Sequence, residues 1–523
     1  MNFRIVIYQL GLVLLVLSLC MLLIVGCSAV AWFSAAGPAE TIAIESMLIS
    51  AVLGTVVGLA LWLIGRRSES DSFGPREALL LVGVSWLIGA AFAGVPYYLW
   101  AILHPDHGDG GVEFASLISC YFEAMSGLTT TGATVLSDIE SIPNSLLLWR
   151  ATTQWLGGLG IIVLFVAVLP TLGVGGKKLF QTEVAGPTQK SVRPRIRDTA
   201  RMLWFIYILF TIVLILLLAL FGMDWFDAVC HSFTTVATGG FSTHNASIGH
   251  YQVENVGVTN FWGIHLVILV GIVLGGVNFG LYYQLARRRF NLVWTDPELR
   301  LYLCILLVAS LLVALNIYAT PIVTTGGEKI EAGLDKSLLY GAFHVASIGT
   351  SAGFCTADSD LWPFTSQAVL VILMFVGASA GSTGGGIKVV RVLIAFKVIL
   401  AEVNRVFRPR VVRTIRVGRA VVDSDQRQSV LVYLLGIVAL FAVGTVLLML
   451  LEPRGSLDIT TAATASAATL NNIGPGLGRV GAIENYGFFT PASKLVMCIL
   501  MALGRLEVFA IFVLFVPSFW RQG

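Results

Sequence analysis

Ten long apolar runs follow one another along this chain and are separated by shorter polar segments. A helix needs about 20 apolar residues to cross the hydrocarbon core of a bilayer, and each run is long enough. The pattern predicts an all-α polytopic membrane protein with about ten spans, at roughly 5–33, 43–65, 77–103, 145–173, 199–222, 258–286, 299–320, 366–400, 428–451 and 491–519.

Four short segments between these runs are polar and rich in glycine, and the first of them is Ser126–Thr134. Such backbone persists at membrane depth only where it is buried in protein or lines a water-filled path. In each segment a polar or small residue stands two places before a glycine. We interpret the four as re-entrant loops around one axis, as in an ion pore. The pairs are Thr130/Gly132, Thr238/Gly240, Ser351/Gly353 and Asn472/Gly474.

Each glycine loop, with the short helix before it and its flanking spans, forms one predicted repeat. The chain then divides into an N-terminal two-helix hairpin and four M1–pore-helix–filter-loop–M2 repeats in a pseudo-four-fold arrangement. The predicted pore half-helices cover 114–129, 223–237, 334–349 and 457–470. The predicted divisions are 1–70 for the hairpin and 71–176, 177–290, 291–404 and 405–523 for the repeats.

The distribution of charge predicts an orientation in the membrane. Charged residues make up only 12% of the 523 residues, and the net charge of +3 gives no reason to expect nucleic acid as a partner. Lys and Arg crowd into alternate loops, as at 177–197, 287–289 and 405–419, whereas the other loops are mostly acidic. By the positive-inside rule, both termini are cytoplasmic and all four glycine loops open outward.

The seven cysteines fit neither a disulfide framework nor a metal spacing. Cys27 follows an apolar run and resembles a lipoprotein processing site. However, the run is longer than the core of a signal peptide, so we expect a retained first span.

The glycine loops suit the chemistry of a dehydrated potassium ion. Potassium gives up its water only if several oxygens replace it, and rings of backbone carbonyls provide them. Glycine permits the backbone angles that turn successive carbonyls toward one axis. The C-terminal ends of the pore helices would add partly negative charge. We therefore expect a potassium-binding filter made of carbonyls from Thr130, Thr131, Gly132, Thr238, Gly239, Gly240, Ser351, Ala352, Gly353, Asn472, Ile473 and Gly474.

Two features of the apolar runs suggest control of this path. The run 366–400 contains a cluster of glycines that cannot hold a stiff helix in mid-span. The cluster either packs closely against a neighbour or forms a flexible loop that blocks the path. Arg505 lies inside the last run, where it must find oxygen partners. It either clamps loop carbonyls or places an electrostatic barrier in the pore. The candidate gate residues are Gly381, Gly384, Gly385, Gly386 and Arg505.

Several longer motifs resemble the Trk/Ktr/HKT superfamily, and most closely its bacterial TrkH branch. The resemblance covers essentially the whole chain, including the N-terminal hairpin. Sodium-preferring plant members carry serine in place of the first filter glycine, so Gly132 implies a preference for potassium. The third loop, with Ser351 and Cys355 where threonines are common, departs from the pattern but keeps Gly353. The matching segments are Gly127–Thr134, Gln154–Ile161, Gly239–His244, Ala380–Gly386, Leu470–Gly476 and Gly504–Glu507.

The resemblance implies uptake of potassium and rubidium through four loops of one subunit, with the glycine-rich segment and Arg505 as the gate. It also implies a homodimer in the bacterial cytoplasmic (inner) membrane, in contact with membrane lipid. A cytosolic nucleotide-binding regulatory ring of the RCK type would control it. We expect no covalently bound cofactor, with potassium as the transported substrate.

A cation-coupled secondary transporter, a symporter of potassium with proton or sodium, is the alternative. It would need carboxylates within the membrane, and the apolar runs hold few besides Glu45 and Glu507. Glu123, His231 and His344 have no second ligand at metal spacing, and we interpret them as packing or outer-mouth groups. No nucleophile triad, zinc-protease motif or dinucleotide fingerprint occurs, so we do not expect an enzyme.

Overall fold

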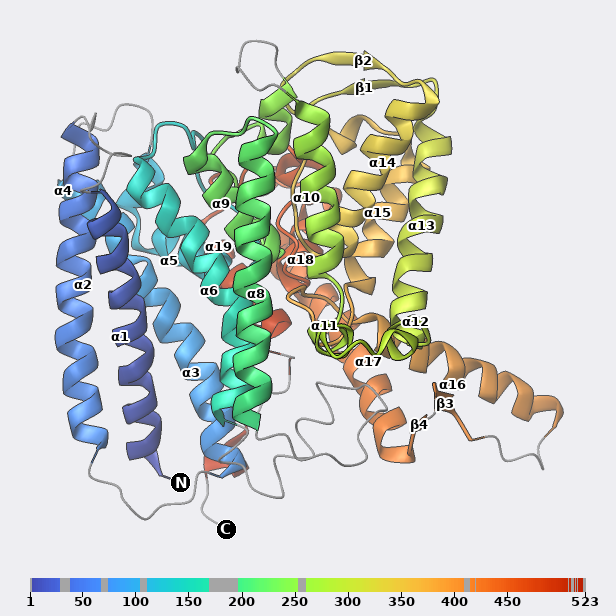
Figure 1. The fold of residues 1–523 in the computed structure, drawn as a ribbon, viewed down its shortest axis with the longest axis horizontal. Coiled ribbons are helices and arrows are strands. Elements are labelled where there is room, and N and C mark those ends of the chain that lie inside the picture. The colour runs from blue at the N-terminus through green and yellow to red at the C-terminus, as the bar shows by residue number, and fades with distance from the viewer. Residues whose placement is uncertain are drawn as a thin grey trace.

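The protein is a bundle of helices that run along one direction, with short hairpins and loops at its two ends (Figure 1). The computed structural model describes residues 2–28, 38–66, 74–103, 111–168, 196–252, 260–408, 414–418, 420–506, 508, 512, 514 and 516–520. The basic segment 177–195 and Glu507 lie outside the described residues. So do residues 29–33 and 169–173 of two predicted spans and parts of the last span.

Among the described residues, six helical segments are long and apolar enough to cross a membrane. A bent pair, α10 with α11, makes a seventh if it counts as one span. The six are α1 (Phe3–Ser28), α2 (Pro38–Gly65), α3 with α4 (Pro75–Ala93 and Val95–Leu103), α8 (Ile196–Leu220), α13 (Pro297–Ile317) and α17 (Ser424–Leu451). The predicted class, an all-α polytopic membrane protein, is confirmed.

The remaining elements follow the predicted order within each repeat, although the divisions between repeats stay a prediction. Repeat 1 also holds η1 (Val112–Ala115), α5 (Leu117–Leu128) and α6 (Asn144–Val168). Repeat 2 adds α9 (Trp225–Val236), η3 (Ser247–Gln252), α10 (Phe261–Gly275) and α11 (Phe279–Ala286). Repeat 3 adds α12 (Phe290–Trp294), β1 (Pro321–Val323), β2 (Lys329–Glu331), α14 (Leu334–Gly349), η5 (Ser359–Leu361), α15 (Phe364–Val376) and α16 (Val389–Phe407). Repeat 4 adds β3 (Arg416–Val417), β4 (Ala420–Val421), α18 (Ile459–Leu470), η6 (Gly478–Val480), α19 (Pro491–Arg505) and α21 (Pro517–Trp520).

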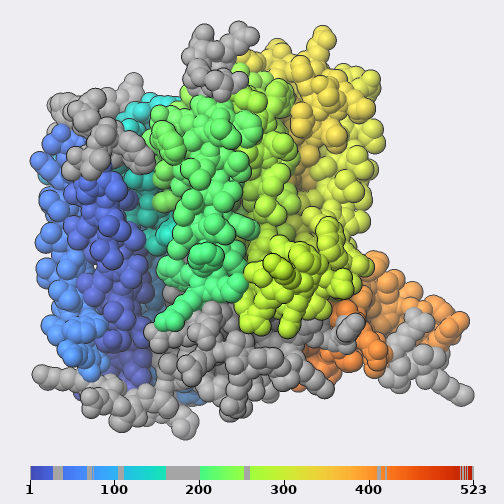
Figure 2. Space-filling view, viewed as in Figure 1, coloured from blue at the N-terminus to red at the C-terminus, as the bar shows by residue number. Residues whose placement is uncertain are grey.

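The N-terminal helices α1 and α2 form the predicted hairpin at one edge of the bundle (Figures 1 and 2). They approach closely because glycines face each other. A methyl group built on Gly11 would lie only 2.7 Å from the carbonyl oxygen of Gly58. Small residues permit such close approach between helices in lipid.

Two predicted spans are not straight helices. In the run 258–286 the chain bends by 94° between α10 and α11. The run 366–400 is interrupted at its glycines, as expected, because α15 ends at Val376 and α16 begins only at Val389. Figures 1 and 2 show α16 projecting from the edge of the bundle. The intervening loop turns the chain aside, and positive φ angles at its glycines, among them Gly377 at 69°, permit the turn.

Candidate functional site

The four predicted pore half-helices, α5, α9, α14 and α18, all end in the same backbone motif. In each, the second residue beyond the helix lies in the left-handed region. The next N–H then bonds to a carbonyl five residues earlier, as from Thr131 to Ser126 at 2.8 Å. This is a Schellman closure, for which glycine is usual. Threonine there bears a conformational cost of roughly 1–2 kcal/mol. The φ angles are 54° at Thr130, 49° at Thr238, 59° at Ser351 and 54° at Asn472.

The four glycines of the predicted filter form a closed ring in chain order. A methyl group built on each glycine would meet a carbonyl oxygen of the next loop, and the last loop returns to the first. All four glycines have positive φ. Only a residue without Cβ fits at these positions. The distances would be 2.1 Å from Gly132 to Gly239 O, 2.0 Å from Gly240 to Ala352 O, 2.1 Å from Gly353 to Ile473 O and 2.8 Å from Gly474 to Thr131 O.

The structure therefore brings the predicted filter segments of all four repeats together. Each pore helix ends just before its segment, so the partly negative C-terminal carbonyls lie beside the ring. The polar side chains at the left-handed positions are buried. That the carbonyls bind potassium stays a prediction. The segments are 130–132, 238–240, 351–353 and 472–474.

Buried polar side chains bind the backbone of the second and fourth loops. Gln154 of α6 donates to the carbonyl of Gly239 at 2.7 Å and accepts from the N–H of Phe241 at 3.2 Å. The hydroxyl of Tyr486 donates to the carbonyl of Gly474 at 2.7 Å. We did not expect these contacts from the sequence. The sequence does indicate that Gln154 is buried and bonded, because its side-chain amide lies in the middle of an apolar run and must find hydrogen-bond partners inside the protein.

A buried ion pair braces the backbone that follows the first two predicted filter segments. Arg150 Nε lies 2.8 Å from Glu123 Oε1, and both side chains are almost fully buried. Glu123 also accepts from the N–H of Val135 at 2.9 Å, and Arg150 reaches the carbonyl of Ser242 at 3.2 Å. Glu123 is therefore an ion-pair partner that fixes the backbone beyond the filter. Its partner Arg150 is identifiable from the sequence, because it is a charged residue inside the predicted span 145–173.

The glycine-rich loop 377–388 lies against the C-terminal ends of the pore helices. The hydroxyl of Thr383 donates to the carbonyl of Val236, at the end of α9, at 3.0 Å. The predicted gate glycines all fit tightly against polar groups or backbone, and two of them, Gly381 and Gly386, also have positive φ. Their nearest neighbours are Asn278 for Gly381, Thr350 O for Gly384, Asn471 O for Gly385 and Gly377 for Gly386.

Arg505 connects this loop to repeat 1. It is the last residue of α19 and is buried, with 3% of its surface exposed. Its two terminal nitrogens donate to the carbonyl of Thr383 at 2.7 Å and to that of Gly157 in α6 at 3.0 Å. The oxygen partners expected for a charge within the membrane are therefore the loop and a neighbouring span. The clamping role predicted for Arg505 agrees with this geometry, and its role as a barrier stays a prediction.

Glu298 anchors both ends of the same loop. Its Oε1 accepts from the N–H of Ala380 at 2.7 Å and from that of Val390 at 3.2 Å. Glu298 is the second residue of α13 and is buried, with 6% exposed. We did not single it out from the sequence, where it is one acid at the start of an apolar run.

We expect Glu298→Gln to weaken this anchor by about 1 kcal/mol, because hydrogen bonds to a charged acceptor are roughly that much stronger than neutral ones. The amides of Ala380 and Val390 should then exchange with deuterium several-fold faster than in the wild type. Glu402→Gln, at an exposed acid of α16, is the control. Equal exchange in Glu298→Gln and wild type would contradict the anchoring role.

Charged side chains also gather beyond the second filter loop. His244 Nε2 lies 3.0 Å from Asp227 Oδ2. Burial lowers the pKa of His244, but its hydrogen bond to Asp227 and the charges of Asp227 and Glu140 outweigh this effect and raise the pKa to about 9. Burial, followed by the charge of His244, lowers the pKa of the neighbouring His250. Asn245 links the two repeats here, because Glu140 Oε1 accepts its N–H at 2.9 Å.

The chain is similar in sequence to known cation transport proteins. The family model TrkH, described as cation transport protein, matches residues 112–522. The Trk system potassium uptake protein TrkH of Salmonella typhimurium is 35% identical over 529 residues, covering 100% of both chains. The protein of the same name from Halomonas elongata is 37% identical over 474 residues, covering 90% of this chain and 91% of the relative.

A solved structure shares the fold over the same length. The crystal structure of the potassium transporter TrkH from Vibrio parahaemolyticus matches with a TM-score of 0.81 and 31% sequence identity, covering 100% of both chains. The N-terminal hairpin, which precedes the segment matched by the family model, is included in this likeness. The chain belongs to the TrkH family of cation transport proteins.

Proposed function

We propose that this protein takes up potassium, and rubidium in its place, across the bacterial cytoplasmic membrane through a single pore lined by backbone carbonyls. The observation that carries the proposal is the closed ring of four glycine loops, each of which abuts the next at Gly132, Gly240, Gly353 and Gly474. A ring of four loops can replace the water of a potassium ion with main-chain oxygens. The names of the relatives, potassium uptake proteins, support the same substrate.

The glycine-rich loop and Arg505 form the gate in this proposal. The loop touches the ends of α9, α14 and α18, and Arg505 ties it to α6. A cation that leaves the filter on this side meets both the loop backbone and a fixed positive charge. Opening then requires the loop to leave its contacts with Val236 and Arg505.

The cytoplasmic side carries the partners in this proposal. Figure 1 places the start of α1 at the end of the bundle opposite the β1–β2 hairpin, on the same side as α16 and the β3–β4 hairpin. Arginines concentrate there, which supports a cytoplasmic location by the positive-inside rule. The apolar face of α16 is largely uncovered, with Val406 85% exposed and Phe407 63% exposed. Such a surface suits a second subunit of a homodimer, lipid, or an RCK-type regulatory ring.

Rubidium flux into liposomes tests the proposal directly. The purified protein is reconstituted into vesicles loaded with potassium chloride, and uptake of radioactive rubidium is followed. We expect uptake with no imposed gradient of protons or sodium, at a rate that either gradient leaves unchanged. Uptake that requires one of these gradients would contradict a simple pore and favour the coupled symporter. Vesicles without protein give the background.

A further inference from the structure

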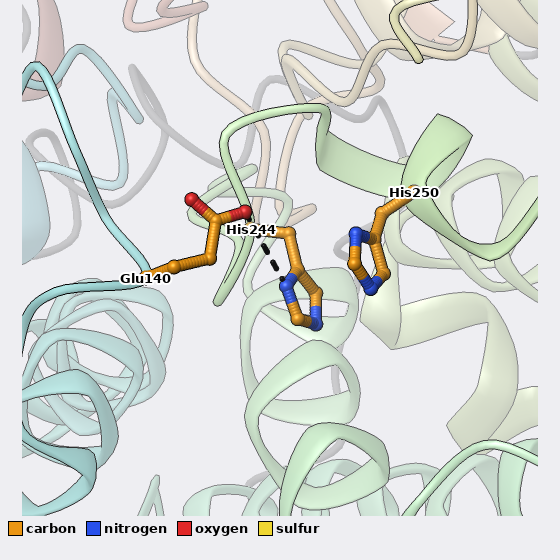
Figure 3. A group of neighbouring side chains, drawn as sticks. All are labelled: Glu140, His244 and His250. Carbon is orange, nitrogen blue, oxygen red and sulfur yellow. Dashed lines mark ion pairs between the residues drawn. The ribbon is translucent and has the colours of Figure 1, made fainter. Parts of the chain in front are cut away.

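Three side chains that can bind a metal ion meet beyond the second filter loop (Figure 3). They are Glu140, which follows the first filter loop, and His244 and His250, which follow the second. Each offers one ligand atom, and these atoms all lie within 4.8 Å of one another. The group is accessible from solvent, because Glu140 is exposed and both histidines are only partly buried. It lies on the side of the β1–β2 hairpin, since Thr325 contacts the adjacent segment at Ala246 at 2.5 Å.

His244 is oriented as metal-binding histidines usually are. Its Nε2 is hydrogen-bonded to the carboxylate of Asp227 at 3.0 Å, and Asp227 is held by the hydroxyls of Tyr251 and Thr243, each at 2.7 Å. Its Nδ1 is buried and has no hydrogen-bond partner within the described part of the chain. This Nδ1 lies 3.6 Å from Glu140 Oε1, too far for a hydrogen bond. A histidine fixed by a carboxylate through one nitrogen presents the other to a metal.

The ring of His250 stacks on that of His244, with centroids 3.5 Å apart and planes 3° from parallel. A metal ion lies close to the plane of each imidazole that binds it, so His250 must turn out of this stack for both rings to bind one ion. The two carboxylates, Asp227 and Glu140, together carry the charge that balances a divalent ion.

We propose that Glu140, His244 and His250 form a binding site for a divalent transition-metal ion of the zinc class. Two imidazole nitrogens and one carboxylate oxygen suit zinc and its neighbours, whereas calcium and magnesium prefer oxygen ligands. Bonds of about 2.0–2.2 Å require the ligand atoms to approach one another by rotation of the side chains, above all that of His250. Glu140 and His250 are exposed enough to rotate, while Asp227 keeps His244 in place.

The site joins repeats 1 and 2 beyond the predicted filter, because Glu140 lies eight residues after Gly132 and His244 lies four residues after Gly240. A bound ion would fix the two segments to each other and add positive charge beside the mouth. The added positive charge would slow the approach of another cation. This consequence depends on the proposed pore, whereas metal binding itself does not.

Isothermal titration of the purified full-length protein with zinc chloride tests the site. We expect binding of one zinc ion by the wild type, and an affinity at least about 10-fold lower in His250→Ala and in Glu140→Gln. The matched control is the double variant His104→Ala/His107→Ala, which removes two other histidines predicted on the outer side and should bind zinc like the wild type. Size-exclusion profiles and thermal midpoints establish that each variant is folded.

Equal zinc affinity in the wild type, His250→Ala and Glu140→Gln would overturn the proposal, as would loss of binding in the histidine control alone. External zinc should also inhibit rubidium flux in the wild type, and at least about 10-fold more zinc should be needed in the two site variants. If no rubidium flux occurs at all, the proposed pore fails, while the titration still decides whether the metal site exists.

Discussion

Arg505→Ala is expected to raise rubidium flux through the protein, without any regulatory partner, by about 100-fold. A fixed positive charge about 6 Å from a passing cation repels it by roughly 3 kcal/mol at an effective dielectric constant of about 20. Removal of a barrier of that size corresponds to a factor of about 100, since 1.4 kcal/mol is tenfold. The substitution also frees the carbonyls of Thr383 and Gly157, so the loop loses one of its anchors. Flux into liposomes at matched protein density measures the effect.

Arg505→Lys separates the two roles of this side chain. Lysine keeps the positive charge but lacks the planar fork that reaches two carbonyls at once. If the charge is the barrier, flux in Arg505→Lys stays near the wild-type value. Equal increases in Arg505→Lys and Arg505→Ala would show that the clamp closes the path. An unchanged flux in Arg505→Ala, with normal expression, would contradict both.

Gly132→Ser is expected to reduce discrimination between rubidium and sodium by at least about tenfold, which corresponds to about 1.4 kcal/mol. The Cβ of serine would lie 2.1 Å from the carbonyl oxygen of Gly239, so this carbonyl must move. A displaced carbonyl changes the size and the field of the ion site on which selectivity depends. Flux of rubidium in competition with sodium measures the ratio.

The control for this prediction is Gly327→Ser. Gly327 has φ +86°, close to the +83° of Gly132, but a Cβ there would meet nothing within 4 Å. Both variants therefore place serine at a positive φ angle, but only in Gly132→Ser does the new side chain displace a carbonyl of the four-loop ring. Unchanged selectivity in Gly132→Ser, or an equal loss in Gly327→Ser, would contradict the assignment of Gly132 to the filter.

The helical bundle and the four loops could be predicted because their signals are local. A membrane span requires only enough apolar residues in a row. Each loop is recognisable by polar residues and glycine at a depth where lipid would otherwise require a helix. The same holds for the pore helices, whose four predicted ranges all contain helices. The position of Arg505 was also visible as a charge in an apolar run.

The partners of these groups could not be predicted, because they come from other repeats. Nothing near Gln154 in the sequence indicates that it bonds to Gly239, and nothing near Glu298 indicates Ala380. The left-handed backbone conformation of Thr130 and Thr238 could not be predicted either, because distant parts of the chain impose it. Thr130 avoids this conformation by local preference, and only the surrounding packing holds it there.

The departure of α16 from the bundle had no clear signal either. The residues on both sides of the glycine loop are apolar, so composition alone continues the span. The loop instead bonds to α10 and α13, through Gly275, Gly276 and Glu298, and these contacts redirect the chain. Backbone bonds between distant segments, rather than the apolar pattern, decided the path.

The order of the loops around the ring has a consequence for how the aperture is closed. Neighbouring loops are consecutive along the chain at three of the four seams, and the polypeptide between them tethers each pair. The fourth seam, where Gly474 meets Thr131, joins the last loop to the first without such a tether. At this seam a Cβ on Gly474 would lie 2.8 Å from the carbonyl oxygen, against 2.0–2.1 Å at the other three. Non-covalent packing alone therefore completes the circle.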